Sequence, residues 1–97
     1  NFNPLTKRDD VGALWENFLI IERIKLNAYT NRYVSNFFWK TYDGTEVDYV
    51  EQYADSLDGY EIKWNHKKKT APESWLKNPN SSYRLINIDN YKEFLEI

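Results

Sequence analysis

The chain has 97 residues, a formal net charge of −2 at pH 7 and no cysteine. The missing thiols exclude a disulfide framework and a thiolate zinc site and fit a reducing, cytoplasmic location, while the charge balance lacks the basic stripe of a strong nucleic-acid binder. No apolar run reaches the roughly 20 residues that span a bilayer, so we expect no membrane partner.

The length of the chain predicts one domain over residues 1–97. The first residue is Asn1 and the sequence contains no methionine, so we expect a domain cut from a longer protein. Aromatic residues make up 18% of the sequence, and they bring a large apolar area to a core of this small size.

A long amphipathic helix is expected near the start of the chain, over residues 11–26, where Asp9 or Asp10 can cap its first turn. The apolar stripe expected to face the core consists of Val11, Leu14, Trp15, Phe18 and Ile21. A second apolar strip is made by Ala13, Ile20 and Ile24, so the helix is expected to be covered on more than one side. Residues 27–33 are expected to form a loop.

Three strands are expected next, over 36–42, 46–53 and 60–64, because these segments are rich in aromatic and β-branched residues. The Asp-Gly pairs at 43–44 and 58–59 are turn signals that separate them. The three strands are therefore predicted to form an antiparallel meander.

The remaining segments predict a crossover and a fourth strand. Pro72 suits the first turn of a short helix over 73–78, a strand is expected over 83–88, and Asp89 or Asn90 can cap a last helix over 91–97. The connection from the third strand is long enough to bring the fourth strand parallel to it. The expected fold is therefore α/β with the order α-β-β-β-α-β-α, a mixed four-stranded sheet flanked by helices.

Two acids on the second and third strands are the main candidate site. Side chains alternate along a strand, so Glu61 and Lys63 share one face while Tyr60, Ile62 and Trp64 share the other. On the second strand, Val47 and Tyr49 are expected on one face and Glu46, Asp48 and Val50 on the opposite one. If the two strands pair as a hairpin, Asp48 lies beside Glu61.

This grouping has a chemical use. Two close carboxylates repel each other unless a cation lies between them, and Mg²⁺ prefers carboxylate oxygens together with water and phosphate. A neighbouring lysine, here Lys63, can orient the attacking water or offset phosphate charge. The competing interpretation is that Glu61 and Lys63 form an ordinary charge pair on the solvated face of a strand.

The first helix offers two further acids, Glu16 and Glu22. Glu16 lies between the two apolar strips, where a boundary glutamate facing solvent is the simpler interpretation, and Glu22 lies nearer the centre of the main stripe. Geometry alone leaves open which of them faces the site. His66 and the lysine run 67–69 follow the third strand; a solvated loop is the simpler interpretation, although the lysines are suited to contacting phosphates.

The segments GALWENF (12–18), TYDGTEVDYVE (41–51) and GYEIKW (59–64), in this order and spacing, resemble a domain of unknown function at the C-terminal end of bacterial and archaeal AAA-type ATPases. That domain is similar to the PD-(D/E)xK nuclease superfamily, which has a restriction-endonuclease-like α-β-β-β-α-β core. The resemblance extends from about residue 10 to the end of the chain.

The resemblance implies roles for four residues. It makes Glu16 the helix acid in preference to Glu22, makes Asp48 and Glu61 the strand acids that bind Mg²⁺ or Mn²⁺ with Glu16, and makes Lys63 the residue that assists the attacking water. The implied partners are DNA or RNA and the ATPase domain of the full-length chain. The alternative is a catalytically inactive interaction or regulatory module with the same fold.

Overall fold

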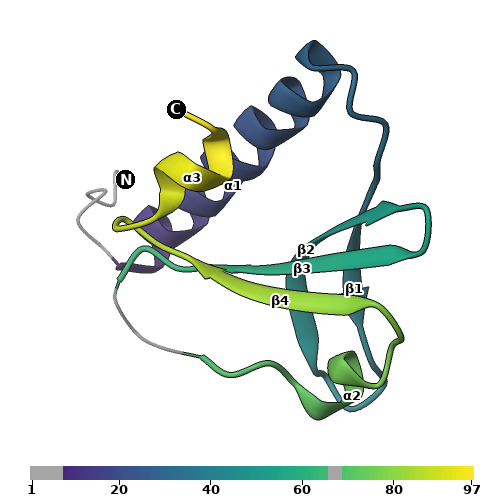
Figure 1. The fold of residues 1–97 in the computed structure, drawn as a ribbon. Helices are drawn as coiled ribbons and strands as arrows, with labels where there is room; N and C mark the ends of the chain where they lie inside the picture. Colours follow the sequence, from purple (N-terminus) through teal and green to yellow (C-terminus); the bar gives the residue numbers. More distant parts are fainter. Residues whose placement is uncertain (1–7, 66–68) are drawn as a thin grey trace.

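The computed structural model describes residues 8–65 and 69–97, which form seven helices and strands (Figure 1). In chain order they are α1 (Arg8–Tyr29), β1 (Ser35–Lys40), β2 (Glu46–Tyr53), β3 (Ser56–Ile62), α2 (Glu73–Leu76), β4 (Ser81–Ile86) and α3 (Tyr91–Leu95). This order confirms the predicted α-β-β-β-α-β-α arrangement.

The four strands form one mixed sheet in the order β1-β2-β3-β4. The β1–β2 and β2–β3 pairs are antiparallel, and β3 pairs in parallel with β4. The connection through α2 supplies the crossover that a parallel pair requires. The predicted mixed four-stranded sheet flanked by helices is therefore confirmed.

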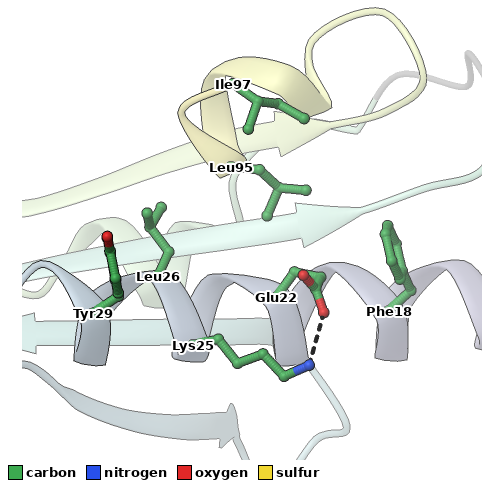
Figure 2. Close-up of a pocket in the computed structure, with 7 residues that line it drawn as sticks. All are labelled: Phe18, Glu22, Lys25, Leu26, Tyr29, Leu95 and Ile97. Carbon is green, nitrogen blue, oxygen red and sulfur yellow. Dashed lines mark hydrogen bonds and ion pairs between the residues drawn. The ribbon is translucent and has the colours of Figure 1, made fainter.

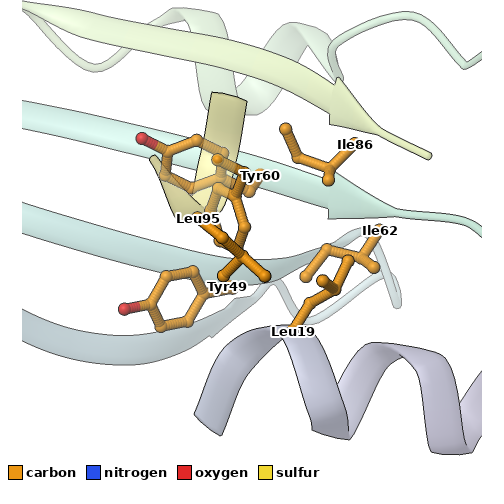
Figure 3. Packing of buried hydrophobic residues seen from close by; sticks show 7 residues of the cluster. Leu19, Tyr49, Tyr60, Ile62, Ile86 and Leu95 are labelled. Carbon is orange, nitrogen blue, oxygen red and sulfur yellow. The ribbon is translucent and has the colours of Figure 1, made fainter. Parts of the chain in front are cut away.

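The larger part of the core lies between one face of the sheet and the helices α1 and α3, which pack against each other (Figures 1 and 3). Its buried members are Leu19, Tyr49, Tyr60, Ile62, Ile86, Phe94 and Leu95. The rings of Tyr60 and Phe94 meet edge to face, with centroids 4.9 Å apart. Aromatic pairs of this kind give a short chain much of its buried apolar area.

A second, smaller cluster lies on the opposite face of the sheet, where α2 packs. Trp75 of α2 is fully buried there against Val47 and Val50 of β2. Its indole N–H donates to the carbonyl of Ser82 at 2.9 Å, so the ring is held by both packing and a hydrogen bond. The ring lies so close to Gly59 of β3 that a Cβ built there would be 2.8 Å from it.

The substitution Gly59→Ala is expected to lower the free energy of unfolding by about 1–3 kcal/mol, because the new methyl group would have to displace the Trp75 ring. Gly12→Ala is the matched control: nothing lies within 4 Å of its added Cβ, and alanine favours a helix over glycine. Urea denaturation of both variants measures the difference. Equal stability of the two would contradict the close packing at Gly59.

The sequence-based expectation for α1 was wrong in its length and in its buried face. The helix continues to Tyr29, through residues expected in a loop, because buried Asn27 bonds Glu51 on the sheet. The buried residues of α1 are Leu19, Arg23 and Asn27. Of the residues in the two expected strips, Trp15 and Ile20 do pack against the core. The expected core residues Leu14, Phe18 and Ile21 are instead about half exposed, as is Ile24 of the second strip.

The second turn prediction was also wrong, because Asp58 and Gly59 lie inside β3 and pair with Glu51 and Val50. The turn comes earlier, where Ala54 adopts a left-handed backbone with φ 51°. Gly59 is required by its contact with Trp75 and has no turn role. The remaining strand and helix boundaries lie within four residues of the predicted ones, and β2 was predicted correctly.

An irregularity in the β1–β2 pairing changes which side chains of β2 share a face. Phe37 pairs with Val50 and Trp39 with Val47, so Phe38 alone lies opposite the two residues Asp48 and Tyr49. Such a β-bulge re-aims side chains. Val47 therefore joins Val50 on the α2 face, and the expectation that Val47 and Tyr49 share a face was wrong.

None of the helices within residues 8–65 and 69–97 is long and apolar enough to cross a membrane.

Candidate functional site

Asp48 and Glu61 lie together where β2 and β3 separate. The antiparallel pairing of the two strands reaches Tyr49 and Tyr60, and the next two residues along this register are Asp48 and Glu61. Beyond the last pair, the Asp48 carboxylate accepts the backbone N–H of Ile62 at 3.1 Å. Just beyond the last ladder pair, the Asp48 side chain thus satisfies a backbone N–H of β3.

Glu61 is the most enclosed member of the site, with only 2% of its surface exposed. Its Oε1 accepts hydrogen bonds from the Lys69 ammonium and from the Tyr83 hydroxyl, each at 3.1 Å. The Lys63 ammonium lies 3.6 Å from Oε2. A buried carboxylate needs such partners, because removal from water penalises its charged form.

The two acids share a hydrogen bond, and their pKa values are shifted in opposite directions. Burial raises the pKa of Asp48, the hydrogen bond with Glu61 raises it further, and the result is a pKa of about 7. Burial also acts to raise the pKa of Glu61, but hydrogen bonds from Asp48 and Lys69 outweigh it, so the pKa of Glu61 lies below its usual value. At pH 7 the Asp48 carboxyl group is therefore protonated in roughly half of the molecules, while Glu61 carries its negative charge.

Lys63 lies just beyond the end of β3, and its backbone is fixed from two sides. Its N–H donates to the Ile86 carbonyl of β4 at 2.9 Å, and its carbonyl accepts the indole N–H of Trp15 at 3.1 Å. Trp64, expected on a continuing strand, lies outside β3, half exposed, with its ring 5.2 Å from that of Trp15. The start of α1 is thereby attached to the part of the chain that carries the two acids.

Glu16, the residue after Trp15, is the helix acid that lies near the site. Burial raises the pKa of its carboxyl group, the charge of Glu61 raises it further, and Lys63 acts in the opposite direction. Glu22 instead pairs with Lys25 at 3.2 Å and lines an open pocket of about 510 Å³ between α1 and α3 (Figure 2). The structure therefore answers the question that the helix geometry left open: Glu16 approaches the acids and Glu22 does not.

The donor set fits a divalent cation held by two carboxylates. Asp48 and Glu61 present adjacent hard oxygen ligands joined by a hydrogen bond, and a bound Mg²⁺ or Mn²⁺ would take the place of that hydrogen bond. Within residues 8–65 and 69–97, no group of three histidine, cysteine or acidic side chains is arranged to hold a metal ion. Glu16 therefore lies near the acid pair without completing a three-ligand cluster. His66, Lys67 and Lys68 lie outside the described residues.

Residues 11–90 match the family described as a domain of unknown function (DUF4143). The chain belongs to this family. No curated protein and no solved structure matches it. The segment that matches DUF4143 contains all four candidate residues, from Glu16 through Asp48 and Glu61 to Lys63.

Sequence reasoning missed Tyr83 as a partner of the acids in this DUF4143 domain. Tyr83 pairs with Gly59 across the parallel β3–β4 ladder, which places it on the face that also carries Glu61. The alternation of side chains along the fourth strand could have placed Tyr83 on this face. The sequence did not define how that strand pairs with β3, so the contact could not be predicted. Lys69 was recognised only as one member of a lysine run, because a loop contact with a strand has no sequence pattern.

Proposed function

We propose that this DUF4143 domain binds Mg²⁺ or Mn²⁺ through Asp48 and Glu61 and hydrolyses phosphodiester bonds of nucleic acid. The observation that carries the proposal is the adjacency of these two carboxyl groups, which share a hydrogen bond, with the Lys63 ammonium 3.6 Å from Glu61. The likeness of the sequence to the PD-(D/E)xK nucleases, and of the α-β-β-β-α-β order to their restriction-endonuclease-like core, supports it.

Each residue has a separate task in this proposal. Asp48 and Glu61 provide the anionic oxygens that hold the cation, and Glu16 adds negative charge on the helix side of the site. When bound, the cation activates a water molecule and stabilises the charge that develops on the phosphate. Lys63 has its backbone anchored to Trp15 and Ile86, so its ammonium is positioned to orient that water or to offset phosphate charge.

We further propose that the domain belongs to the C-terminal end of an AAA-type ATPase and that its own ATPase domain is a partner. The resemblance of segments 12–18, 41–51 and 59–64 supports this context. DNA and RNA are equally compatible with a site that recognises a phosphodiester through a cation and a lysine.

Isothermal calorimetry with Mn²⁺ tests the cation site. The wild-type domain is expected to bind Mn²⁺ with a measurable heat, and Asp48→Asn is expected to lose most of the affinity because one of its two anionic ligands is neutral. Glu22→Gln removes an acid of the same helix as Glu16 away from the site, so it serves as the control and should bind like wild type. Equal heats for Asp48→Asn and wild type would exclude Asp48 as a ligand.

A nuclease assay with Mn²⁺ on plasmid DNA, single-stranded DNA and single-stranded RNA tests the activity. Cleavage is expected to fall to background in both Glu61→Gln and Lys63→Met, because one loses a cation ligand and the other the ammonium beside the phosphate. Lys25→Met removes a surface ammonium that pairs with Glu22, and it should leave cleavage unchanged. Cleavage that survives both site changes would identify a contaminating nuclease.

A second candidate is an inactive interaction or regulatory module. It is favoured by the lack of a three-ligand cluster among the described residues and by the engagement of Glu61 with two ammonium groups. Mn²⁺ binding without cleavage of any of the three substrates, with and without the ATPase portion, would decide for this alternative.

A further inference from the structure

Lys69 and Tyr83 contact the same oxygen of Glu61 with different chemistry. The Lys69 ammonium and the Tyr83 hydroxyl each lie 3.1 Å from Oε1, so one donor brings a positive charge and the other brings none. Glu61 is 2% exposed at its side chain, while the side chain of Lys69 is 41% exposed. The buried acid is therefore reached from solvent by a lysine that remains half in water.

The ammonium groups around Glu61 oppose the binding of a divalent cation. Lys63 and Lys69 bring two positive charges to Glu61 alone. A divalent cation entering beside Glu61 would meet two ammonium groups at short distance, and at about 5 Å even water-like screening leaves a repulsion that weakens binding roughly tenfold for each of them.

The two lysines differ in their freedom to leave. Lys63 has both its backbone N–H and its carbonyl in hydrogen bonds, to Ile86 and from Trp15. Lys69 belongs to the connection between β3 and α2, outside any helix or strand, and it reaches Glu61 through its long side chain. Rotation of that side chain into solvent would expose Oε1 without moving the sheet.

We propose that Lys69 is an internal counter-ion, which occupies Glu61 in the cation-free protein and competes with the divalent cation for that carboxylate. The inference rests on the cation site of the proposed function and adds its regulation. Tyr83 stays on Oε1 as a positioning residue, because its neutral hydroxyl orients the carboxylate without opposing a cation. The released Lys69 ammonium is then free to contact the phosphate of a bound nucleic acid.

Calorimetric Mn²⁺ titration of Lys69→Gln and Tyr83→Phe tests the inference. Each variant removes one donor from the same oxygen, and only Lys69→Gln removes a charge. Lys69→Gln is expected to bind Mn²⁺ about tenfold more tightly than wild type, whereas Tyr83→Phe is expected to bind no more tightly. The tightening should shrink as NaCl is raised, because salt screens the ammonium charge.

The melting temperature without a divalent cation is the second readout. Lys69→Gln is expected to melt several degrees below wild type, because Glu61 loses a counter-ion, and saturating Mn²⁺ should remove this difference in melting temperature. If wild type binds Mn²⁺ and Lys69→Gln binds it equally or more weakly, the competition is disproved while the cation site stands. If neither protein binds Mn²⁺, the cation site and the competition both fail. Binding by Lys69→Gln alone would support both.

Discussion

Arg23→Met is expected to lower the free energy of unfolding by about 3–5 kcal/mol, a large share of the stability of a domain of this size. The Arg23 guanidinium donates to both carboxylate oxygens of Glu51, at 2.8 and 3.0 Å, and to the Phe94 carbonyl at 2.7 Å. Glu51 is 2% exposed, so without Arg23 its charge would remain buried beside the neutral donors Asn27 and Tyr49. Urea denaturation followed by circular dichroism measures the loss.

Two comparisons make the Arg23 result interpretable. Lys25→Met removes a cation from the same helix that pairs with Glu22 in an exposed position, and it should change stability by no more than about 0.5 kcal/mol. The double variant Arg23→Met/Glu51→Leu should regain part of the lost stability, because no uncompensated charge is then buried. A loss in Arg23→Met no larger than in Lys25→Met would show that the buried ion pair has little weight in stability.

Asp48→Asn is expected to make the cation-free domain more stable than wild type at pH 8 and equally stable near pH 4. The pKa of Asp48 is raised from 3.8 to about 7, first by burial and then by the hydrogen bond with Glu61. That displacement corresponds to about 4 kcal/mol, and solvent screening of this half-buried group reduces the expected gain to about 1–2 kcal/mol. Asparagine keeps a donor for Glu61 without ionising.

The direction follows from proton linkage. A raised pKa means that the folded state binds the Asp48 proton more tightly than the unfolded state, so this contribution to stability is complete below pH 3.8 and is lost as pH rises through about 7. The difference between Asp48→Asn and wild type should therefore grow between pH 4 and pH 8. Thermal melts across this range measure it, with Asp55→Asn in the exposed turn after β2 as a baseline for charge removal. A difference that stays constant with pH would refute the raised pKa.

The order of elements could be predicted because each carries a local pattern, whereas the buried face of α1 could not. Hydrophobic spacing favoured Leu14, Phe18 and Ile21, yet the helix turns Arg23 and Asn27 inward. These polar residues are buried because Glu51, more than 20 positions away in the sequence, receives their hydrogen bonds. A helical wheel contains no information about a partner on another element.

The acid pair shows the opposite case, since strand parity and a hairpin were enough to bring Asp48 next to Glu61. The bulge opposite Asp48 and Tyr49 was not predictable, because it depends on how β1 pairs with β2. The Asp58-Gly59 pair was misread for a similar reason. An Asp-Gly pair is compatible with a tight turn and also with a strand in which glycine makes space for a neighbouring ring. The position of the Trp75 ring against Gly59 shows that the second case applies here.

The hydrogen bond from Arg23 to the Phe94 carbonyl joins residues 71 positions apart and has a consequence for biosynthesis. During translation, α1 leaves the ribosome long before α3. The Arg23 guanidinium therefore stays solvated until Phe94, whose carbonyl accepts its hydrogen bond, has been synthesised. Closing so long a segment is slow compared with forming a hairpin. We therefore expect the β1–β2–β3 meander to form first and α1 to dock only after α3 has been synthesised, which makes the nascent chain most exposed to proteases along this helix.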